Sequence, residues 1–208
     1  MIDNMYPIDK SLLDGRLICL TPIDVEKDAE IESMWTHDPE YLRLLGVDVV
    51  LPLSPAHLKK RYEDLEKKMA ESGDQFYFAI RLQDGDAAES ENTENGGSVR
   101  RLVGFIELDG VHWSHGDSYV GIGIGERECW SKGYGTDAMK VVLRYAFEEL
   151  NLHRVSLNVF EYNQRAIHSY EKVGFVVEGC ERQFLRREGK RWDMIYMGIL
   201  RADWEEKN

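Results

Sequence analysis

Short segments in which apolar residues dominate or alternate with polar ones recur along the chain, and each predicts a β-strand. Glycine, proline, asparagine and acidic residues bound these segments, as is usual for turns. The predicted strands span residues 16–21, 76–82, 102–108, 119–124, 154–159, 175–184 and 191–200. Asp109-Gly110, after the third of them, predicts a tight turn.

A second pattern, with apolar residues every three or four positions, predicts helices. It begins after Ser54-Pro55, a capping residue followed by a proline, and is weaker over residues 24–35. Residues 164–173 form another predicted helix, which Gly174 ends. The helix after Ser54-Pro55 has an apolar face of Leu58, Tyr62, Leu65 and Met69. The helix after Gly135 buries Met139, Val142, Leu143, Ala146, Phe147 and Leu150.

Strands alternate with helices in the second half of the chain, which predicts an α/β (α+β) fold with a mixed or parallel sheet. We expect one domain over residues 1–208, with its core at about 16–200. Residues 83–98 (QDGDAAESENTENGGS) contain few apolar side chains and many acidic ones. They predict a flexible acidic loop between two strands.

The composition narrows the function classes. The formal net charge is −12, which argues against nucleic acid as a partner, because phosphate binding needs clustered cations. That charge would suit a cationic substrate, although acidic surfaces also serve solubility. We expect no membrane span and no signal peptide, since no apolar run is long enough. The three cysteines form no CxxC pair, so a reducing cytoplasmic location is expected.

Candidate chemistry is concentrated in residues 126–136 (ERECWSKGYGT), which connect a strand to a helix. The first amides of a helix have no partner within it, and the helix dipole favours an anion there. Gly133 and Gly135 let the backbone approach a phosphate closely, Thr136 can contact a phosphate oxygen, and Lys132 adds a positive charge. The alternative is that the glycines only shape a tight turn.

Two known phosphate loops were compared with this segment. The pattern GxxxxGK[ST] is absent, because Lys132 precedes the first glycine. The dinucleotide pattern GxGxxA is present at residues 133–138, and Glu161 falls near the place of the ribose-binding acid. However, residues 126–132 separate the strand from the glycines, and only about 70 residues follow, too few for a doubly wound sheet. A dinucleotide-binding protein is therefore a weaker alternative.

Two blocks of sequence carry a family resemblance. Residues 119–138 (YVGIGIGERECWSKGYGTDA) resemble the acyl-CoA-binding segment of the GCN5-related N-acetyltransferases, the GNAT family. Residues 163–175 (NQRAIHSYEKVGF) match the family pattern N-x-x-A-x-x-x-Y-x-x-x-G-F, and the likeness extends to Leu200. The branch that acetylates N-termini of ribosomal proteins is most similar, and spermidine acetyltransferases are similar too. The first 15 residues and the acidic loop lie outside the resemblance.

The resemblance implies a twisted mixed sheet of about seven strands flanked by helices. The strands near 119–124 and 154–159 would splay apart and admit the pantetheine arm of acetyl-CoA, which would hydrogen-bond to exposed backbone groups of Gly123 and Ile124. The amides of residues 132–136 would hold the diphosphate, and Asn163 would bond the pantetheine. The cofactor-binding residues that the resemblance implies are Ile122, Gly123, Ile124, Lys132, Gly133, Tyr134, Gly135, Thr136, Asn163 and Ala166.

The resemblance also implies catalytic roles. Tyr170 would protonate the departing thiolate, the alternative being a helix aromatic packed under Phe175. Some relatives carry a glutamate general base where this chain has Asn158, which cannot accept a proton. We therefore name Glu107, on the neighbouring strand, as the candidate base. The alternatives are that water serves as the base and that Glu107 is only a solvated strand residue. The family usually has Arg or Gln at the position of Trp130, although the ribosomal-protein branch often has Trp there too, so one polar phosphate contact is missing while cofactor binding is still expected.

The predicted function is direct transfer of an acetyl group from acetyl-CoA to an amine. An N-terminal peptide, a polyamine or an aminoglycoside are all open as acceptors, and whether the protein forms a homodimer is open too. An acyl-cysteine on Cys129 is disfavoured, because no base is marked for it. His112 and His115 are expected at a hairpin tip and not in a metal site. A non-catalytic acyl-CoA-binding protein is the main alternative, motivated by Asn158.

Overall fold

The computed structural model describes residues 12–46, 49–83 and 100–207. Their strands form one seven-stranded sheet in the order β1-β2-β3-β4-β5-β7-β6. The strands are β1 (Ile18–Thr21), β2 (Phe76–Leu82), β3 (Leu102–His112), β4 (Asp117–Ile124), β5 (Arg154–Phe160), β6 (Val176–Arg187) and β7 (Lys190–Leu200). The helices are α1 (Val25–Trp35), α2 (Pro39–Leu45), α3 (Pro55–Ser72), α4 (Tyr134–Arg144), α5 (Gln164–Val173) and α6 (Arg201–Glu205).

The predicted α/β class and all seven predicted strands are confirmed. The predicted helices are present as well, and the one after Gly135 ends in a π-helical turn, Tyr145–Glu149, that follows α4. The predicted acidic loop, residues 83–98, lies outside the described residues except for Gln83.

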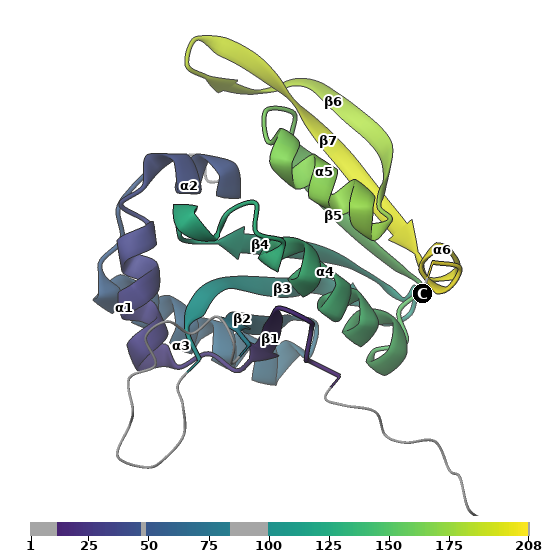
Figure 1. Cartoon of the computed structure of the whole chain (residues 1–208), viewed down its shortest axis with the longest axis horizontal. Helices are drawn as coiled ribbons and strands as arrows, with labels where there is room; N and C mark the ends of the chain where they lie inside the picture. Colours follow the sequence, from purple (N-terminus) through teal and green to yellow (C-terminus); the bar gives the residue numbers. More distant parts are fainter. Residues whose placement is uncertain (1–11, 47–48, 84–99, 208) are drawn as a thin grey trace, which may run out of the picture.

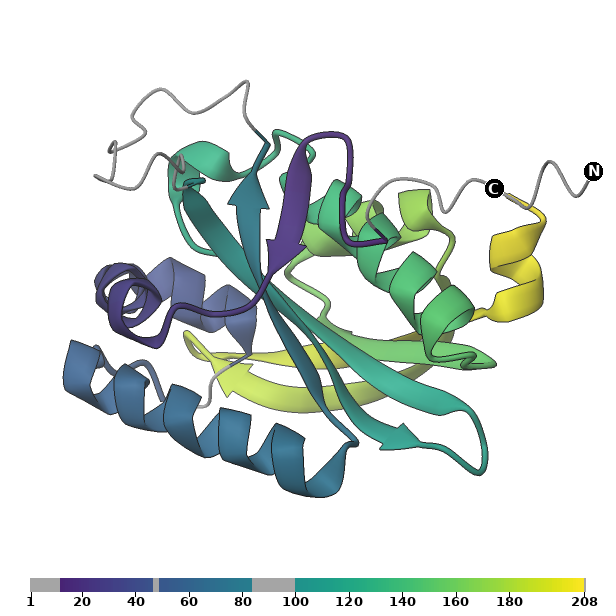
Figure 2. The same ribbon diagram turned by 90° about the horizontal axis from the view of Figure 1, so that it is seen from below.

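Two hydrophobic clusters cover opposite faces of the sheet, because side chains alternate along each strand. On one face, Ile106 of β3 is buried with Met139 and Phe147 from the α4 segment. On the other face, Phe105 is buried with Leu58 of α3. Figure 2 shows α1 and α3 on one side of the strands and α4 on the other.

The two halves of the sheet meet at β4 and β5. These strands pair in parallel only over residues 117–119 and 154–156, and they then diverge (Figure 1). Every other strand pair among the described residues is antiparallel. A doubly wound dinucleotide-binding sheet is mostly parallel, so the dinucleotide alternative does not fit this fold.

The peptide groups of β4 point alternately to its two sides. Gly125 donates its backbone N–H to the Val103 carbonyl oxygen at 2.9 Å, so Gly123 also directs its peptide groups toward β3. Ile122 and Ile124 therefore direct theirs toward β5, which no longer pairs with β4 at this level. The backbone groups of β4 that face the gap without a strand partner are therefore those of Ile122 and Ile124. The expectation that Gly123 presents backbone groups to a ligand does not match this alternation.

The predicted turn at Asp109-Gly110 is wrong. Strand β3 continues through it to His112, and the turn occupies residues 113–116. The strand register shifts between Asp109 and His112, and Gly110 has φ of 62°. Asp-Gly here marks a bulge, because glycine adopts positive φ without strain inside a strand as well as in a turn.

Helix α2 was not predicted, although its end signals are present in the sequence. The Asp38 side chain caps the helix by accepting the N–H of Glu40 at 2.9 Å, Pro39 opens it, and Gly46, with φ of 93°, ends it. The helix has only seven residues, too few to display an apolar period. The short α6 was missed for the same reason.

The close approach of β3 and β4 allows a paired stability test. A Cβ at Gly104 would lie 2.1 Å from the carbonyl oxygen of Gly123, whereas a Cβ at Gly179 in β6 would have no neighbour within 4 Å. We expect Gly104→Ala to lower the free energy of unfolding by about 1–3 kcal/mol. Gly179→Ala should change it by less than about 0.5 kcal/mol. Urea unfolding of both variants measures the difference, and equal stabilities would contradict the packing described.

Candidate active site

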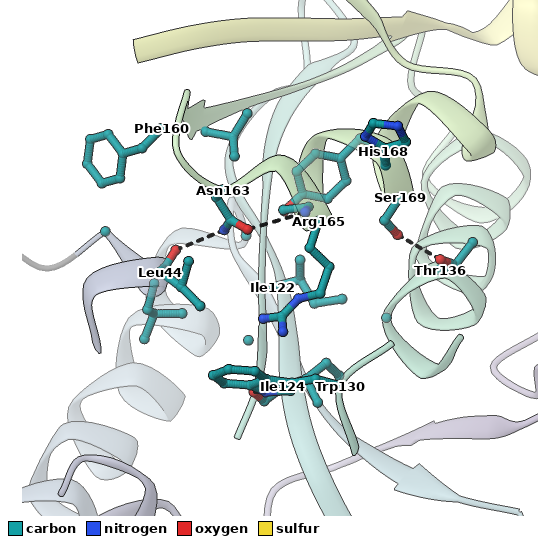
Figure 3. A pocket seen from close by; sticks show the side chains of 18 of the residues that line it. Leu44, Ile122, Ile124, Trp130, Thr136, Phe160, Asn163, Arg165, His168 and Ser169 are labelled. Atoms are coloured by element: carbon teal, nitrogen blue, oxygen red, sulfur yellow. Dashed lines mark hydrogen bonds between the residues drawn. The ribbon is translucent and has the colours of Figure 1, made fainter. Parts of the chain in front are cut away.

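A cavity of about 600 Å³ lies where β4 and β5 diverge. Its walls come from α2, β4, the segment before α4, the first turn of α4, β5 and α5 (Figure 3). The predicted site residues that line it are Ile122, Gly123, Ile124, Gly133, Tyr134, Gly135, Thr136, Asn158, Asn163, Ala166 and Tyr170. Lys132 and Glu107 are not in the lining. The structure thus brings the two sequence blocks together around one cavity.

The start of α4 forms one end of the cavity. Its N-cap, Gly133, has φ of 92° and no side chain caps the helix. The first bond of the helix runs from Asp137 N to the Gly133 oxygen at 2.9 Å, so the amides that precede Asp137 take no part in its internal ladder. Lys132 is exposed beside this turn. The geometry suits an anion, since partial positive charge collects at such an end.

Asp137 fixes that helix end to the rest of the protein. Its Oδ2 accepts the backbone N–H of Leu17 at 2.7 Å and that of Ile18 at 3.2 Å. A carboxylate in the first turn also complements the helix dipole. The position of the α4 start is therefore tied to β1 at the edge of the sheet.

Helix α5 supplies the wall next to α4. Asn163 caps it, with Oδ1 accepting the Ala166 N–H at 3.2 Å, and Nδ2 donates to the Leu44 carbonyl oxygen of α2 at 3.4 Å (Figure 3). The hydroxyl groups of Ser169 and Thr136 lie 2.7 Å apart and join α5 to α4. The side chain of Asn163, expected to bond the cofactor, is thus already engaged in positioning two helices.

Tyr170 lies in the cavity wall next to Phe175, with their ring centroids 6.0 Å apart. Within the described part of the chain its hydroxyl makes no hydrogen bond. Burial raises the pKa of Tyr170 to about 12, so the phenol keeps its proton at neutral pH. The hydroxyl is available as a donor to a ligand.

Asn158 and Glu107 occupy different surroundings. Asn158 is exposed on β5 and lines the cavity. Glu107 lies on β3 against Gly121, where an added Cβ would be 2.9 Å from Glu107 Oε1, and Gln75 Nε2 donates to Glu107 Oε2 at 3.4 Å. Burial, and then the charge of Asp109, raise the pKa of the Glu107 carboxyl. Gly121 itself lines the cavity, so a single glycine separates Glu107 from it.

More acidic and phenolic groups surround Glu107 on the α1 and α3 side of the sheet. Glu32 is buried, accepts the Tyr62 hydroxyl and lies 3.5 Å from Arg61, and burial is the main cause of its raised pKa. The hydroxyls of Tyr41 and Tyr77 are buried without a partner among the described residues. Because Tyr41 also lines the cavity, this polar cluster borders it.

Helix α2 closes the cavity on the side away from α4, and its last carbonyl groups are bound by residues from the other half of the sheet. The Arg43 carbonyl oxygen accepts the Tyr162 hydroxyl at 2.7 Å and Arg187 Nη1 at 3.0 Å. At the helix start, Asp38 accepts Arg127 Nε at 2.6 Å. Sequence reasoning missed this wall because the helix itself was not predicted.

Two groups of metal-ligand type lie away from the cavity centre. His112 ends β3 and His115 lies in the β3–β4 turn, at a hairpin tip as expected, and His112 Nδ1 lies 3.5 Å from Asp117 Oδ2. Glu126 groups with two neighbours, Glu128 and Cys129, but Arg101 forms ion pairs with both carboxylates. Arginine thus neutralises the charge that would attract a cation.

The sequence model of a family described as an acetyltransferase (GNAT) domain matches residues 17–176. The chain belongs to the GNAT family. The match includes the cavity-lining segments of β4, α4 and α5. The predicted resemblance to the GNAT family is therefore confirmed.

Individual relatives carry related names. The chain is 34% identical over 191 residues to the SPbeta prophage-derived uncharacterized N-acetyltransferase YokL of Bacillus subtilis, covering 92% of this chain and 94% of that protein. It is 33% identical over 104 residues to the "Putative ribosomal N-acetyltransferase YdaF" of the same organism, covering 50% of this chain and 56% of that protein. A spermidine N(1)-acetyltransferase of Vibrio cholerae is 32% identical over 105 residues, covering 50% of this chain and 60% of that protein. The chain thus spans just over half the length of the last two.

Among solved structures, the crystal structure of spermidine N-acetyltransferase from Vibrio cholerae in complex with CoA and spermine matches with a TM-score of 0.71 and 22% identity. It covers 90% of this chain and 98% of that chain. The likeness confirms the predicted GNAT fold. Among the described helices, none is at once long and apolar enough to cross a bilayer.

The double role of Asn163 predicts a stability effect. Asn163→Ala should lower the free energy of unfolding by about 1 kcal/mol, because it removes the α5 cap and the bond to α2. Asn158→Ala is the matched control: its side chain makes no hydrogen bond within the described ranges, and the residue is exposed, so its effect should stay below about 0.5 kcal/mol. Urea unfolding distinguishes the two, and a fully stable Asn163→Ala variant would refute the positioning role.

Proposed function

We propose that this protein transfers an acetyl group directly from acetyl-CoA to a primary amine. The observation that carries the proposal is the cavity between the diverging strands β4 and β5, with the uncapped start of α4 at one end. A thioester carried on a long arm fits between strands, and its diphosphate fits a helix start. Membership of the GNAT family supports the same reading.

The pantetheine arm would add to β4 as an extra strand. Ile122 and Ile124 direct their peptide groups toward the gap, but the Ile124 carbonyl oxygen already accepts Trp130 Nε1 at 2.8 Å. We therefore assign the arm to the peptide groups of Ile122 and the N–H of Ile124. The amides of residues 133–136 would bind the diphosphate, with Lys132 contributing long-range attraction from the surface.

The proposed acetyl transfer needs no cofactor other than acetyl-CoA, because every bond and proton in the step is accounted for. The amine lone pair attacks the thioester carbonyl, the carbon–sulfur bond breaks, and the proton lost by nitrogen equals the one gained by sulfur. One of the β4 amides directed into the gap would bind the thioester carbonyl of the arm and stabilise its oxyanion. Cys129 also lines the cavity, but burial raises the pKa of its thiol. The thiolate needed for an acyl-cysteine is thus disfavoured, which supports direct transfer.

Tyr170 would serve the leaving sulfur. A phenol with pKa about 12 is a weaker acid than an ordinary thiol, so complete transfer to a free thiolate is uphill. Burial beside Tyr170, which raises the pKa of the phenol, would also raise that of the CoA thiol and narrow the difference. We assign Tyr170 a hydrogen bond to the sulfur that strengthens as charge develops, with the proton following when the bond breaks.

The acceptor would approach from the α1 and α3 side, where Glu107 and the Glu32–Arg61 pair lie near the hydroxyls of Tyr41 and Tyr77, which have no partner among the described residues. Carboxylates and phenols suit an ammonium group, and the net charge of −12 favours a cationic acceptor. N-terminal peptides, as the name of YdaF suggests, and polyamines, as that of the Vibrio cholerae enzyme suggests, are therefore the first acceptors to test, with aminoglycosides third.

A non-catalytic acyl-CoA-binding protein is the second candidate. It is favoured by Asn158, which offers no base at the position where some family members carry glutamate. Binding of acetyl-CoA without transfer to any amine in a panel of N-terminal peptides, polyamines and aminoglycosides would select this candidate over an enzyme.

The acid role of Tyr170 gives the first kinetic prediction. The wild-type protein should bind acetyl-CoA in calorimetry, and Tyr170→Phe should lower kcat by about 100-fold or more while binding is retained. Tyr145→Phe is the control, since Tyr145 packs against Phe76 and Phe78 and does not line the cavity. A fully active Tyr170→Phe enzyme would remove the acid role, and an absence of acetyl-CoA binding would remove the proposed function.

The base role of Glu107 gives a pH prediction. A base must be deprotonated, so kcat/KM should rise as pH increases through the Glu107 pKa, which lies above that of an ordinary glutamate. Glu107→Gln should abolish this limb of the profile. Asp109→Asn should move it to lower pH, because the Asp109 charge helps to raise the Glu107 pKa. A limb unchanged in Glu107→Gln would assign the proton to another group or to water.

A further inference from the structure

Trp130 stands where the family usually carries Arg or Gln, and the structure shows what the tryptophan does there. Its Nε1 donates to the Ile124 carbonyl oxygen at 2.8 Å, which fixes the ring in the cavity wall. A Cβ at Gly135 would lie 3.6 Å from Ile124 Cγ1, so Ile124 lies between the ring and the first turn of α4. The ring therefore borders the place proposed for the cofactor diphosphate.

Two arginines contact this ring, and they differ in their charge partners. The Arg127 guanidinium lies 5.5 Å from the ring centroid and forms ion pairs of 2.6 Å with both Asp38 and Glu40. The Arg165 guanidinium lies 4.0 Å from the centroid. Within the described ranges Arg165 has neither an ion pair nor a hydrogen bond. Arg127 is thus paired with two acids, whereas the acid that acts on Arg165 from a distance is Glu40, which Arg127 already binds.

Arg165 lines the cavity, and Figure 3 shows its side chain extending from α5 over the Trp130 ring. Burial lowers the pKa of its guanidinium, but an arginine remains charged at any physiological pH. A partly dehydrated cation without an ion pair of its own is unfavourable by itself, and stacking on an indole and the more distant charge of Glu40 offset only part of that cost. A bound anion would offset the rest.

We propose that Arg165, held over the Trp130 ring, binds a phosphate group of acetyl-CoA and replaces the polar contact that the loop lost at position 130. This inference rests on the proposed function. The planar guanidinium can engage two phosphate oxygens at once. Helix α5 packs against the first turn of α4, where Thr136 and Ser169 lie 2.7 Å apart, so the guanidinium and the α4 amides can hold one phosphate together. Trp130 is the positioning residue, and Arg165 makes the contact.

The test compares ligands that differ in their phosphates. Calorimetry with CoA and 3′-dephospho-CoA, and competition by phosphate-free pantetheine, are measured for the wild type and Arg165→Ala. We expect Arg165→Ala to weaken CoA binding by about 10- to 100-fold and to leave pantetheine competition unchanged. An equal loss with 3′-dephospho-CoA assigns the contact to the diphosphate, and a loss confined to CoA assigns it to the 3′-phosphate.

Matched variants keep the result interpretable. Arg127→Ala removes the other arginine on the same ring and should leave CoA affinity within about twofold, because that charge is already paired. Arg165→Lys should recover part of the lost affinity, and Trp130→Ala should weaken CoA binding in the same direction as Arg165→Ala. Thermal unfolding of each variant confirms folding.

Unchanged CoA affinity in a folded Arg165→Ala variant would overturn the inference, as would an equal loss for CoA and pantetheine. Failure of the wild type to bind CoA would instead refute the proposed function, so the two failures are distinguishable.

Discussion

Backbone pairing between β4 and β5 covers only three residues on each strand, 117–119 and 154–156, and the site depends on where that pairing stops. Every peptide group beyond it on the facing edge of β4 lacks a strand partner, and such groups are costly when buried. One of these groups, the Ile124 carbonyl oxygen, has a partner within the protein, because it accepts the indole N–H of Trp130. The rest is left for a ligand with peptide-like hydrogen-bonding groups, and pantetheine has two amides of that kind.

Positively and negatively charged groups around that gap lie on different faces of the sheet. The α4 start, Lys132 and Arg165 place positive charge at one end of the cavity, while Glu107 lies on the opposite face of the sheet, where Arg61 pairs with Glu32. A donor with an anionic handle and an acceptor with a cationic one would therefore be drawn to different sides. The separation also keeps the ammonium of an acceptor away from the phosphates of the donor, where it would bind unproductively.

Sequence alone could predict the elements whose signals are local. The strands, the helices after Ser54-Pro55 and Gly135, and the grouping of residues 133–136 with Tyr170 all follow from periodicity and motif. Helix α2 could not be found by period because it is too short, and Asp109-Gly110 was misread because a bulge and a turn favour the same residues.

Side-chain partnerships across the fold could not be predicted either. Nothing in the sequence indicates that Asn163 is engaged with α2, or that Arg127 forms ion pairs while Arg165 forms none with the residues the structure describes. These facts depend on contacts between residues distant along the chain, such as Arg127 with Asp38. The charge that matters in a site is the one left after such pairing, which a composition cannot give.

The hydrogen bonds to the end of α2 have a mechanical consequence. A helix leaves its last carbonyl groups unpaired, and here Tyr162, Asn163 and Arg187 bind those of Arg43 and Leu44. These hydrogen bonds attach the seven-residue helix α2 to the half of the sheet that contains β5 and β7. The elements before and after α2 in the sequence, α1 and α3, pack on the other half. Widening of the gap would stretch these bonds first, so the entry of a bulky ligand and the order of α2 should be coupled.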